Sequence, residues 1–376
     1  MGLKKDVRCG IIYIMKYDKT LSKDDFITLK IRLNALKKNE NLVKMAKRAV
    51  KTEKFQVIFA NTDDFFINSL KPVPFKSRGY NGEFSFSEKE LISDTKEFFA
   101  MLDGYAEGDY SLLERAEKNL QFLQPHKDNP NYRSHVSPIS QKIHVNSMGY
   151  IDNLTDFVHE FTHSMSPIFS KELARLPYYK SLLEVCPLFC EKIALNVFLP
   201  AKYPGLKRNI VDCKISAECS RRNALIQTEI EGLLVKILAG EMSVGEAVKK
   251  YYPIFKEKNI RQKSAVNFVL QRFENVDKTR KSNNPRLIFG ESGYYFCNVI
   301  ASYMYEKWQE NPQKMTENFK VILANDGLWS PEIFHSYMGA DFDEMYKDFI
   351  TRHPKYAEGL CREQQQIRDD EFAQLR

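Results

Sequence analysis

Apolar residues recur along the chain at two spacings, which separate strand-like from helical segments. Ile, Val and aromatic residues gather in two short runs, and a third short run alternates apolar with polar residues. We expect strands there, the third as an edge strand, at Gly10–Tyr17, Phe55–Ala60 and Gln141–Asn146. Helical spacing of three to four residues predicts helices at Leu21–Thr52, Ser87–Ala106 and Ser111–Leu123. Prolines make Gln124–Pro138 a predicted loop or boundary between lobes.

The pattern is almost wholly helical from Leu154 onward. Predicted helices cover 181–199, Arg221–Ala239 (closed by Gly240), Gly293–Glu310, Pro312–Ala324 and Asp341–Arg352. The sequence therefore predicts a mainly α fold with a small β-sheet (α+β), arranged in two lobes. We expect a mixed α/β lobe over 1–138, a helical region over 139–360 and a charged tail over 361–376.

Composition excludes several classes of protein. A hydrophobic content of 43% with 28% charged residues is ordinary for a globular protein. No run of about eighteen apolar residues is present, so no membrane span or membrane partner is expected. The 56 basic and 49 acidic residues are interleaved, and the densest basic run, Lys278–Lys281, is short. A solvated surface explains this pattern, so we expect no nucleic-acid partner.

Cysteine usage and the amino terminus bear on the compartment. Seven cysteines, an odd number, favour free thiols in a reducing environment. Cys186 and Cys190 lie four apart on a predicted helix with no second pair nearby, which favours buried thiols over metal ligands. No secretory signal is recognisable. A cytoplasmic location is expected, with export by another route left open; the sequence does not indicate an oligomeric state.

The segment 156–167 reads D-F-V-H-E-F-T-H-S-M-S-P and contains the spacing H-E-x-x-H. On a helix, this spacing puts His159 and His163 on one face, one turn apart, where both can bind one Zn²⁺. Glu160 between them can contact a water on the metal and act as general base. Asn153 is a predicted N-cap, and Pro167 ends the helix. The motif predicts one zinc ion per chain.

A third protein ligand has to come from farther along the chain. The metzincin extension is excluded, because Ser166 and Phe169 stand where it needs a glycine and a third histidine. Glu172 follows the motif too closely for a returning helix. Glu184 and Glu191 share a face of the predicted helix at 181–199, being seven residues apart. One would bind the metal and the other would support a ligand.

The residues around this motif resemble a known family. The segment 146–165, N-S-M-G-Y-I-D-N-L-T-D-F-V-H-E-F-T-H-S-M, is similar to the active-site region of the oligopeptidase F and thimet oligopeptidase family, and L-L-E-V-C-P-L-F-C-E resembles its next helix. The resemblance, weaker through 293–305 and 328–342, implies that Glu184 is the third ligand and that Glu191 supports the site. It also implies an oxyanion donor at Tyr294 or Tyr295. This chain has Thr162 in place of the family's glycine, and we expect it to lack part of the family's N-terminal lobe.

The resemblance implies a zincin-like two-lobed metallopeptidase fold with an active-site cleft, in which the helical region over 139–360 is the catalytic zinc-peptidase region. These features predict a zinc-dependent metallopeptidase that cuts short peptides through attack of a zinc-bound water assisted by Glu160. The predicted edge strand that ends at Asn146 would either hold an extended peptide substrate or serve as an ordinary structural strand. Two alternatives stay open: a specialised effector-type protease with one protein target, and a non-catalytic binding protein on the same scaffold. The intact Glu160 disfavours the second, since a structural metal has no need of that carboxylate.

Overall fold

The described part of the chain folds into two compact units. The computed structural model describes residues 23–51, 86–106, 108–127, 132–137, 140–167, 183–247, 260–276, 290–325 and 331–374. One unit combines Met1–Phe55 with Ile230–Ile288, and the other combines Gln56–Glu229 with Phe289–Arg376. The two strands predicted before residue 61 lie outside the described residues. The predicted lobe boundaries at residues 138 and 360 stay a prediction.

The smaller unit is held by ion pairs between helices. Its described helices are α1 (Lys23–Lys37), α2 (Glu40–Ala49), the end of α10 (Lys207–Ala239) and α12 (Ile260–Val276). Arg32 of α1 binds Glu274 of α12 through two contacts, of 2.7 and 3.0 Å. Such a bidentate pair restricts the relative orientation of the two side chains in addition to pairing their charges. Residues 38 and 39 break the single helix that the sequence predicts at 21–52 into α1 and α2.

The larger unit contains a three-stranded sheet with the order β1-β3-β2. β1 (Leu123–His126) runs parallel to β3 (Lys142–Asn146), and β2 (His135–Ser137) runs antiparallel to it. Ile143 and Val145 are fully buried, while His144 between them is polar and partly exposed, as the predicted alternation requires.

Two predictions about this sheet are wrong. β3 is the central strand, paired on both sides, and not an edge strand, so it offers no free edge to a substrate. Residues 124–138 are not all loop, because they contain β2 and most of β1. Pro125 is compatible with β1 because an edge strand leaves one side of its backbone unpaired. The outer strands form through pairing with β3, a contact that local patterns do not report.

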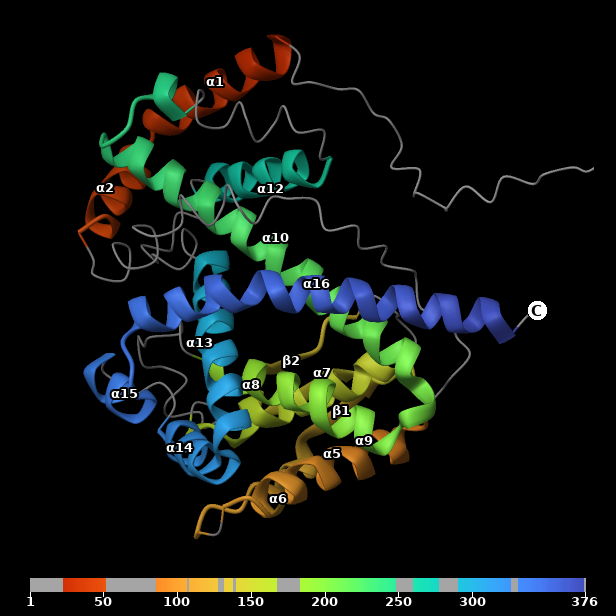
Figure 1. Cartoon of the computed structure of the whole chain (residues 1–376). Coiled ribbons are helices and arrows are strands. Elements are labelled where there is room, and N and C mark those ends of the chain that lie inside the picture. The colour runs from red at the N-terminus through yellow and green to blue at the C-terminus, as the bar shows by residue number, and fades with distance from the viewer. Residues whose placement is uncertain are drawn as a thin grey trace, which may run out of the picture. The chain divides into compact units, whose positions relative to one another are not determined.

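Helices supply the rest of the larger unit. They are α5 (Glu88–Asp103), α6 (Leu112–Asn119), α7 (Ile151–Met165), α8 (Val185–Ile193), α9 (Leu199–Lys202), the first part of α10, α13 (Gly290–Glu310), α14 (Pro312–Ala324), α15 (Pro331–Met338) and α16 (Phe342–Gln374). Short helical turns are η1 (Leu120–Phe122), the π-helical η4 (Ala194–Phe198) and η5 (Pro204–Leu206). The chain is mainly helical with a small sheet, which confirms the predicted fold class (Figure 1).

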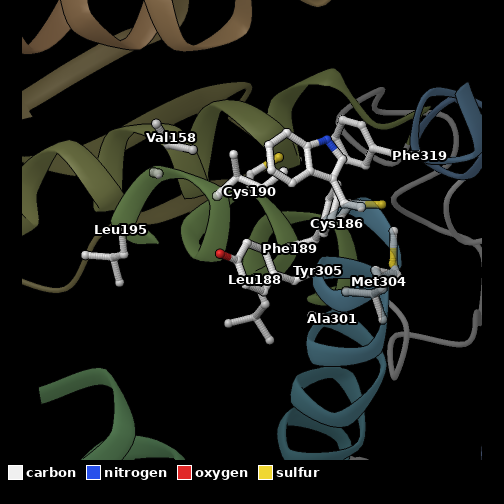
Figure 2. Close-up of a cluster of buried hydrophobic side chains, with 14 of the residues drawn as sticks. Val158, Cys186, Leu188, Phe189, Cys190, Leu195, Ala301, Met304, Tyr305 and Phe319 are labelled. Carbon is white, nitrogen blue, oxygen red and sulfur yellow. The ribbon is translucent and has the colours of Figure 1, made fainter. Parts of the chain in front are cut away.

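The main hydrophobic core lies where α7, α8, α13 and α14 meet. Figure 2 shows Leu188, Phe189 and neighbouring residues of α8 close to Met304 of α13 and Phe319 of α14. The rings of Phe189 and Phe319 lie 5.2 Å apart. Cys186 and Cys190 are fully buried in this core as free thiols, and burial raises the pKa of the Cys190 thiol to about 12. This core fixes α8 against α7, the helix that carries the predicted zinc motif.

Several helix boundaries differ from those predicted. α14 has the predicted bounds, with Asn311 as its N-cap, and α10 ends before Gly240 as predicted. α10 begins fourteen residues earlier than expected, at Lys207, and α16 continues to Gln374 through the predicted charged tail. None of the helices in the described part combines the length and apolarity that a membrane span needs.

Candidate metal centre

Side-chain hydrogen bonds fix both ends of α7. At its start, the Asn153 Oδ1 accepts from the backbone N–H groups of Gly149 and Tyr150, each at 3.0 Å. The helix therefore begins two residues before Asn153, which is not the N-cap that the sequence predicts. At its end, the Asn119 amide donates to the Ser164 carbonyl at 3.0 Å. The Tyr110 hydroxyl also donates there, to the carbonyl of Met165 at 2.9 Å.

The two faces of α7 have different surroundings. Phe157, Val158 and Phe161 are at most 1% exposed and pack into the core. The opposite positions carry the two histidines, whose side chains are 12% exposed for His159 and 17% for His163. Apolar burial on one side thus orients both imidazoles toward accessible space, as the helical spacing predicts.

The imidazoles converge on a carboxylate from the next helix. The Oε2 atom of Glu184 lies 3.2 Å from the Nε2 atom of His159 and 3.3 Å from the Nε2 atom of His163. Glu184 occupies the N-cap position of α8, just before the helix rather than within it as predicted. The core packing of α8 on α7 therefore sets the position of this carboxylate relative to the histidines.

This arrangement fits a tetrahedral zinc ion. Ligands about 2.0–2.2 Å from a tetrahedral zinc lie roughly 3.3–3.6 Å from one another. One carboxylate oxygen at 3.2 and 3.3 Å from two imidazole nitrogens approaches this spacing. Within the described residues, these three side chains form the group whose donor atoms could hold one metal ion. Two imidazoles with a carboxylate are also a donor set that zinc accepts readily.

Glu191 contacts the opposite nitrogen of the first histidine. Its Oε1 lies 2.6 Å from the Nδ1 atom of His159. An Nδ1–H donated to this carboxylate leaves the Nε2 lone pair directed at the metal position. Burial alone would lower the pKa of His159, but Glu191 and Glu184 raise it well above its usual value. A metal therefore has to displace a proton from this imidazole.

Glu160 is a buried carboxylate beside the two histidines. It is 6% exposed, and its Oε2 has no hydrogen-bond partner among the described residues. Burial raises its pKa above the ordinary value of a glutamate, while the neighbouring histidines oppose that effect. A buried oxygen without a partner carries a desolvation cost, so its retention beside a metal position suits a proton acceptor.

The two predicted tyrosines lie in different surroundings. Tyr295 is 2% exposed and packs in the core, with its ring 6.3 Å from that of Phe349. Tyr294 is partly buried and lines a cavity together with Glu191. Burial raises the pKa of Tyr294 well above 10, and Glu191 and Glu184 add to this shift, so its hydroxyl stays protonated.

Asp156 is a site-adjacent residue that the motif alone does not reveal. It lies one turn before His159 on α7, lines the same cavity and accepts a hydrogen bond from the Ser134 hydroxyl at 3.2 Å. Burial, with the charges of Asp152 and Glu191, raises the pKa of Asp156 to about 7. Helical spacing from the first histidine is the sequence signal that could have identified it.

Comparisons with known proteins find a similar fold among solved structures but no matching family. No protein-family model and no curated protein matches the chain. Among solved structures, the fold is similar to the "Crystal structure of a putative oligoendopeptidase F from Bacillus anthracis str. Ames", with 13% identity and a TM-score of 0.49. The match covers 89% of this chain and 62% of the other, so this chain spans less than two thirds of that protein. The function proposed below rests on the site and not on this similarity.

Proposed function

We propose that this protein is a zinc-dependent metallopeptidase. The observation that carries the proposal is the convergence of His159, His163 and Glu184 around one point, with their ligand atoms within 4.8 Å of one another. The unpartnered carboxylate of Glu160 on the same helix adds a candidate base. Two histidines and a glutamate leave a fourth coordination position for water, which is typical of catalytic rather than structural zinc sites.

Each residue would have a distinct role in peptide hydrolysis. When bound, zinc supplies a Lewis acid and lowers the pKa of a water toward neutrality. The two Nε2 atoms and the Glu184 Oε2 would hold the ion, while Glu191 keeps His159 in the tautomer that can bind it. Glu160 accepts the proton of the attacking water and delivers it to the leaving amine.

For the developing oxyanion we assign the donor role to Tyr294 rather than Tyr295. The cavity position of Tyr294 and its raised pKa both support a protonated hydroxyl that can donate. Removing one oxyanion donor typically costs about 10²–10³ in turnover. The role predicted for Asn146 at a free strand edge is not carried forward, because β3 is paired on both sides.

A Glu160→Gln substitution tests the proposal. It keeps shape and ligands but removes the proton acceptor, so zinc should stay at one ion per chain while turnover falls by about 10²–10⁴. The assay digests a mixed peptide library and reads cleavage by mass spectrometry, with a chelator arm. Glu317→Gln, at a partly exposed position of α14, is the matched control and should retain full activity.

Two results would contradict the peptidase proposal. One is the absence of stoichiometric metal after purification without chelators. The other is equal cleavage by wild type and Glu160→Gln. If zinc is bound but the library stays intact, a proteome digest separates a protease with one protein target from a binding protein. The former would cut a defined protein there, and the latter would cut none.

A further inference from the structure

A cavity of about 240 Å³ lies next to the candidate metal centre. Residues of α7, α8, α10, α13 and α16 line it, all within the larger unit. Glu191 and Tyr294 belong to its wall, which places it against the His159 side of the centre. Small-molecule sites usually measure roughly 300–1,000 Å³. This cavity therefore suits one amino-acid side chain or chain terminus better than a cofactor.

Four of the five carboxylates in the cavity wall pair with a described side chain. Glu191 contacts His159 at 2.6 Å, and Asp156 accepts a hydrogen bond from Ser134. Arg352 pairs with two more acidic side chains, at 2.8 and 2.5 Å. The remaining one, Asp152, also takes part in an interaction. Most of the acidic charge of the wall is thus paired within the protein.

The cations of the wall are Lys192, Lys214, Arg221 and Arg352, and neither Lys192 nor Arg221 is satisfied in the same way as the carboxylates. Lys192 of α8 makes no hydrogen bond and no ion pair with its side chain to any described residue. Arg221 of α10 is 9% exposed and donates through Nη1 to Glu218 at 2.8 Å. Its Nε is buried and has no hydrogen-bond partner among the described residues. A buried guanidinium with a free N–H is costly unless a ligand accepts from it.

The electrostatics of Lys192 and Arg221 also favour a bound anion. Burial lowers the pKa of Lys192 well below 10.5, and the charge of Arg221 lowers it further. The acidic neighbours Glu218, Glu191 and Glu306 oppose this shift. An anion between the ammonium and the guanidinium would offset both the burial and the mutual repulsion.

We propose that this cavity binds a carboxylate group of the peptide substrate through Lys192 and Arg221. The proposal rests on the proposed function, since it assigns the carboxylate to a peptide that reaches the metal centre. The group is either the C-terminal α-carboxylate or the side chain of an acidic residue, which offer the same two acceptor oxygens. An arginine fork and a lysine ammonium are suited to both.

Peptide binding without turnover tests the proposal. The full chain with Glu160→Gln is titrated with three acetylated tripeptides by calorimetry: Ala-Gln-Ala as the free acid, Ala-Glu-Ala as the amide, and Ala-Gln-Ala as the amide. At least one of the two acidic peptides should bind about tenfold more tightly than the neutral one, as expected for one charge-assisted hydrogen bond. The acidic peptide that binds more tightly identifies the source of the carboxylate.

Variants connect the preference to the cavity. Lys192→Met and Arg221→Gln should reduce the ratio of affinities toward one, whereas Lys314→Met, at an exposed position of α14, should keep it. Arg221→Gln leaves Glu218 without this partner, so Lys192→Met carries the test if that variant does not fold. Equal binding of all three peptides, no binding of the acidic ones, or an unchanged ratio in Lys192→Met overturns the proposal. Failure of the peptidase function would appear separately, as missing zinc or missing cleavage with the carboxylate preference intact.

Discussion

Two groups of histidines in the larger unit have opposite surroundings. On α7, His159 and His163 direct their Nε2 atoms at one oxygen of Glu184, at 3.2 and 3.3 Å. On the sheet, three other histidines contact one another. The Nε2 atom of His126 lies 3.1 Å from the Nδ1 atom of His144, and the ring of His135 stacks on that of His144 at 4.6 Å.

The difference shows that the number of histidines does not identify a metal site. In the sheet group, the imidazoles use each other as hydrogen-bond partners and meet through ring faces. In the helix group, carboxylates contact both nitrogens of His159. The Nε2 atoms of His159 and His163 converge on the same oxygen of Glu184. The pKa values diverge accordingly. Burial and the two neighbouring histidines lower that of His144, while acidic neighbours raise that of His159 despite burial.

Replacing one histidine from each group should give the largest contrast. His163→Ala removes a proposed ligand, so zinc affinity should fall by more than the roughly 10–100-fold that outer partners of a metal contribute. His135→Ala should leave zinc affinity unchanged, because its imidazole lies in the stack on the sheet. Competition with a chromophoric chelator measures both. Equal affinities in the two variants would mean that the metal does not bind on α7.

Glu191→Gln should give an intermediate effect. The amide keeps an acceptor for the His159 N–H but removes the negative charge, so zinc affinity should fall by about 10–100-fold. Glu317→Gln, at its partly exposed position on α14, serves again as the control. An unchanged affinity would show that Glu191 has no influence on the ligand it contacts.

The histidines on the sheet should make a smaller contribution, which appears in the stability of the protein at acid pH. The folded state lowers the pKa of His144 below 6.5, so the unfolded chain takes up a proton first as pH falls. This contribution to stability is present above about pH 6.5 and is lost as pH falls through the folded pKa. In thermal melts with chelator present, His144→Gln should reduce the acid-induced drop in Tm by on the order of 1–2 °C. A larger drop in the variant would show that the sign is wrong.

Local patterns predicted some parts of the molecule well. Pro312 at the start and an asparagine cap define α14, and both signals lie within the helix or next to it. The spacing of His159 and His163 likewise depends on helix geometry alone. For the third ligand, residue spacing left Glu184 and Glu191 equivalent. The structure separates them, because one contacts both Nε2 atoms and the other contacts Nδ1 of His159.

Features that depend on distant segments could not be predicted in this way. β1 and β2 become strands only through β3, and no local alternation marks them. Lys192 and Arg221 come from different helices, and nothing in the sequence indicates that both line one cavity. Only the packing of the described residues reveals that the Lys192 ammonium makes no ion pair there and that the Arg221 Nε has no hydrogen-bond acceptor. The sequence therefore predicted the donor residues of the centre better than the walls beside it.

The hydrogen bonds at both ends of α7 have a consequence for how the chain would bind zinc. Asn153, Asn119 and Tyr110 hold this helix through contacts that involve neither histidine. Core packing holds α8 in the same way, so we expect the donor atoms to be assembled before any ion arrives. In zinc fingers, by contrast, the free energy of metal binding drives folding itself. Here we expect metal binding and folding to be separate equilibria. A chain that has lost its zinc to a chelator should stay folded and bind zinc again without refolding.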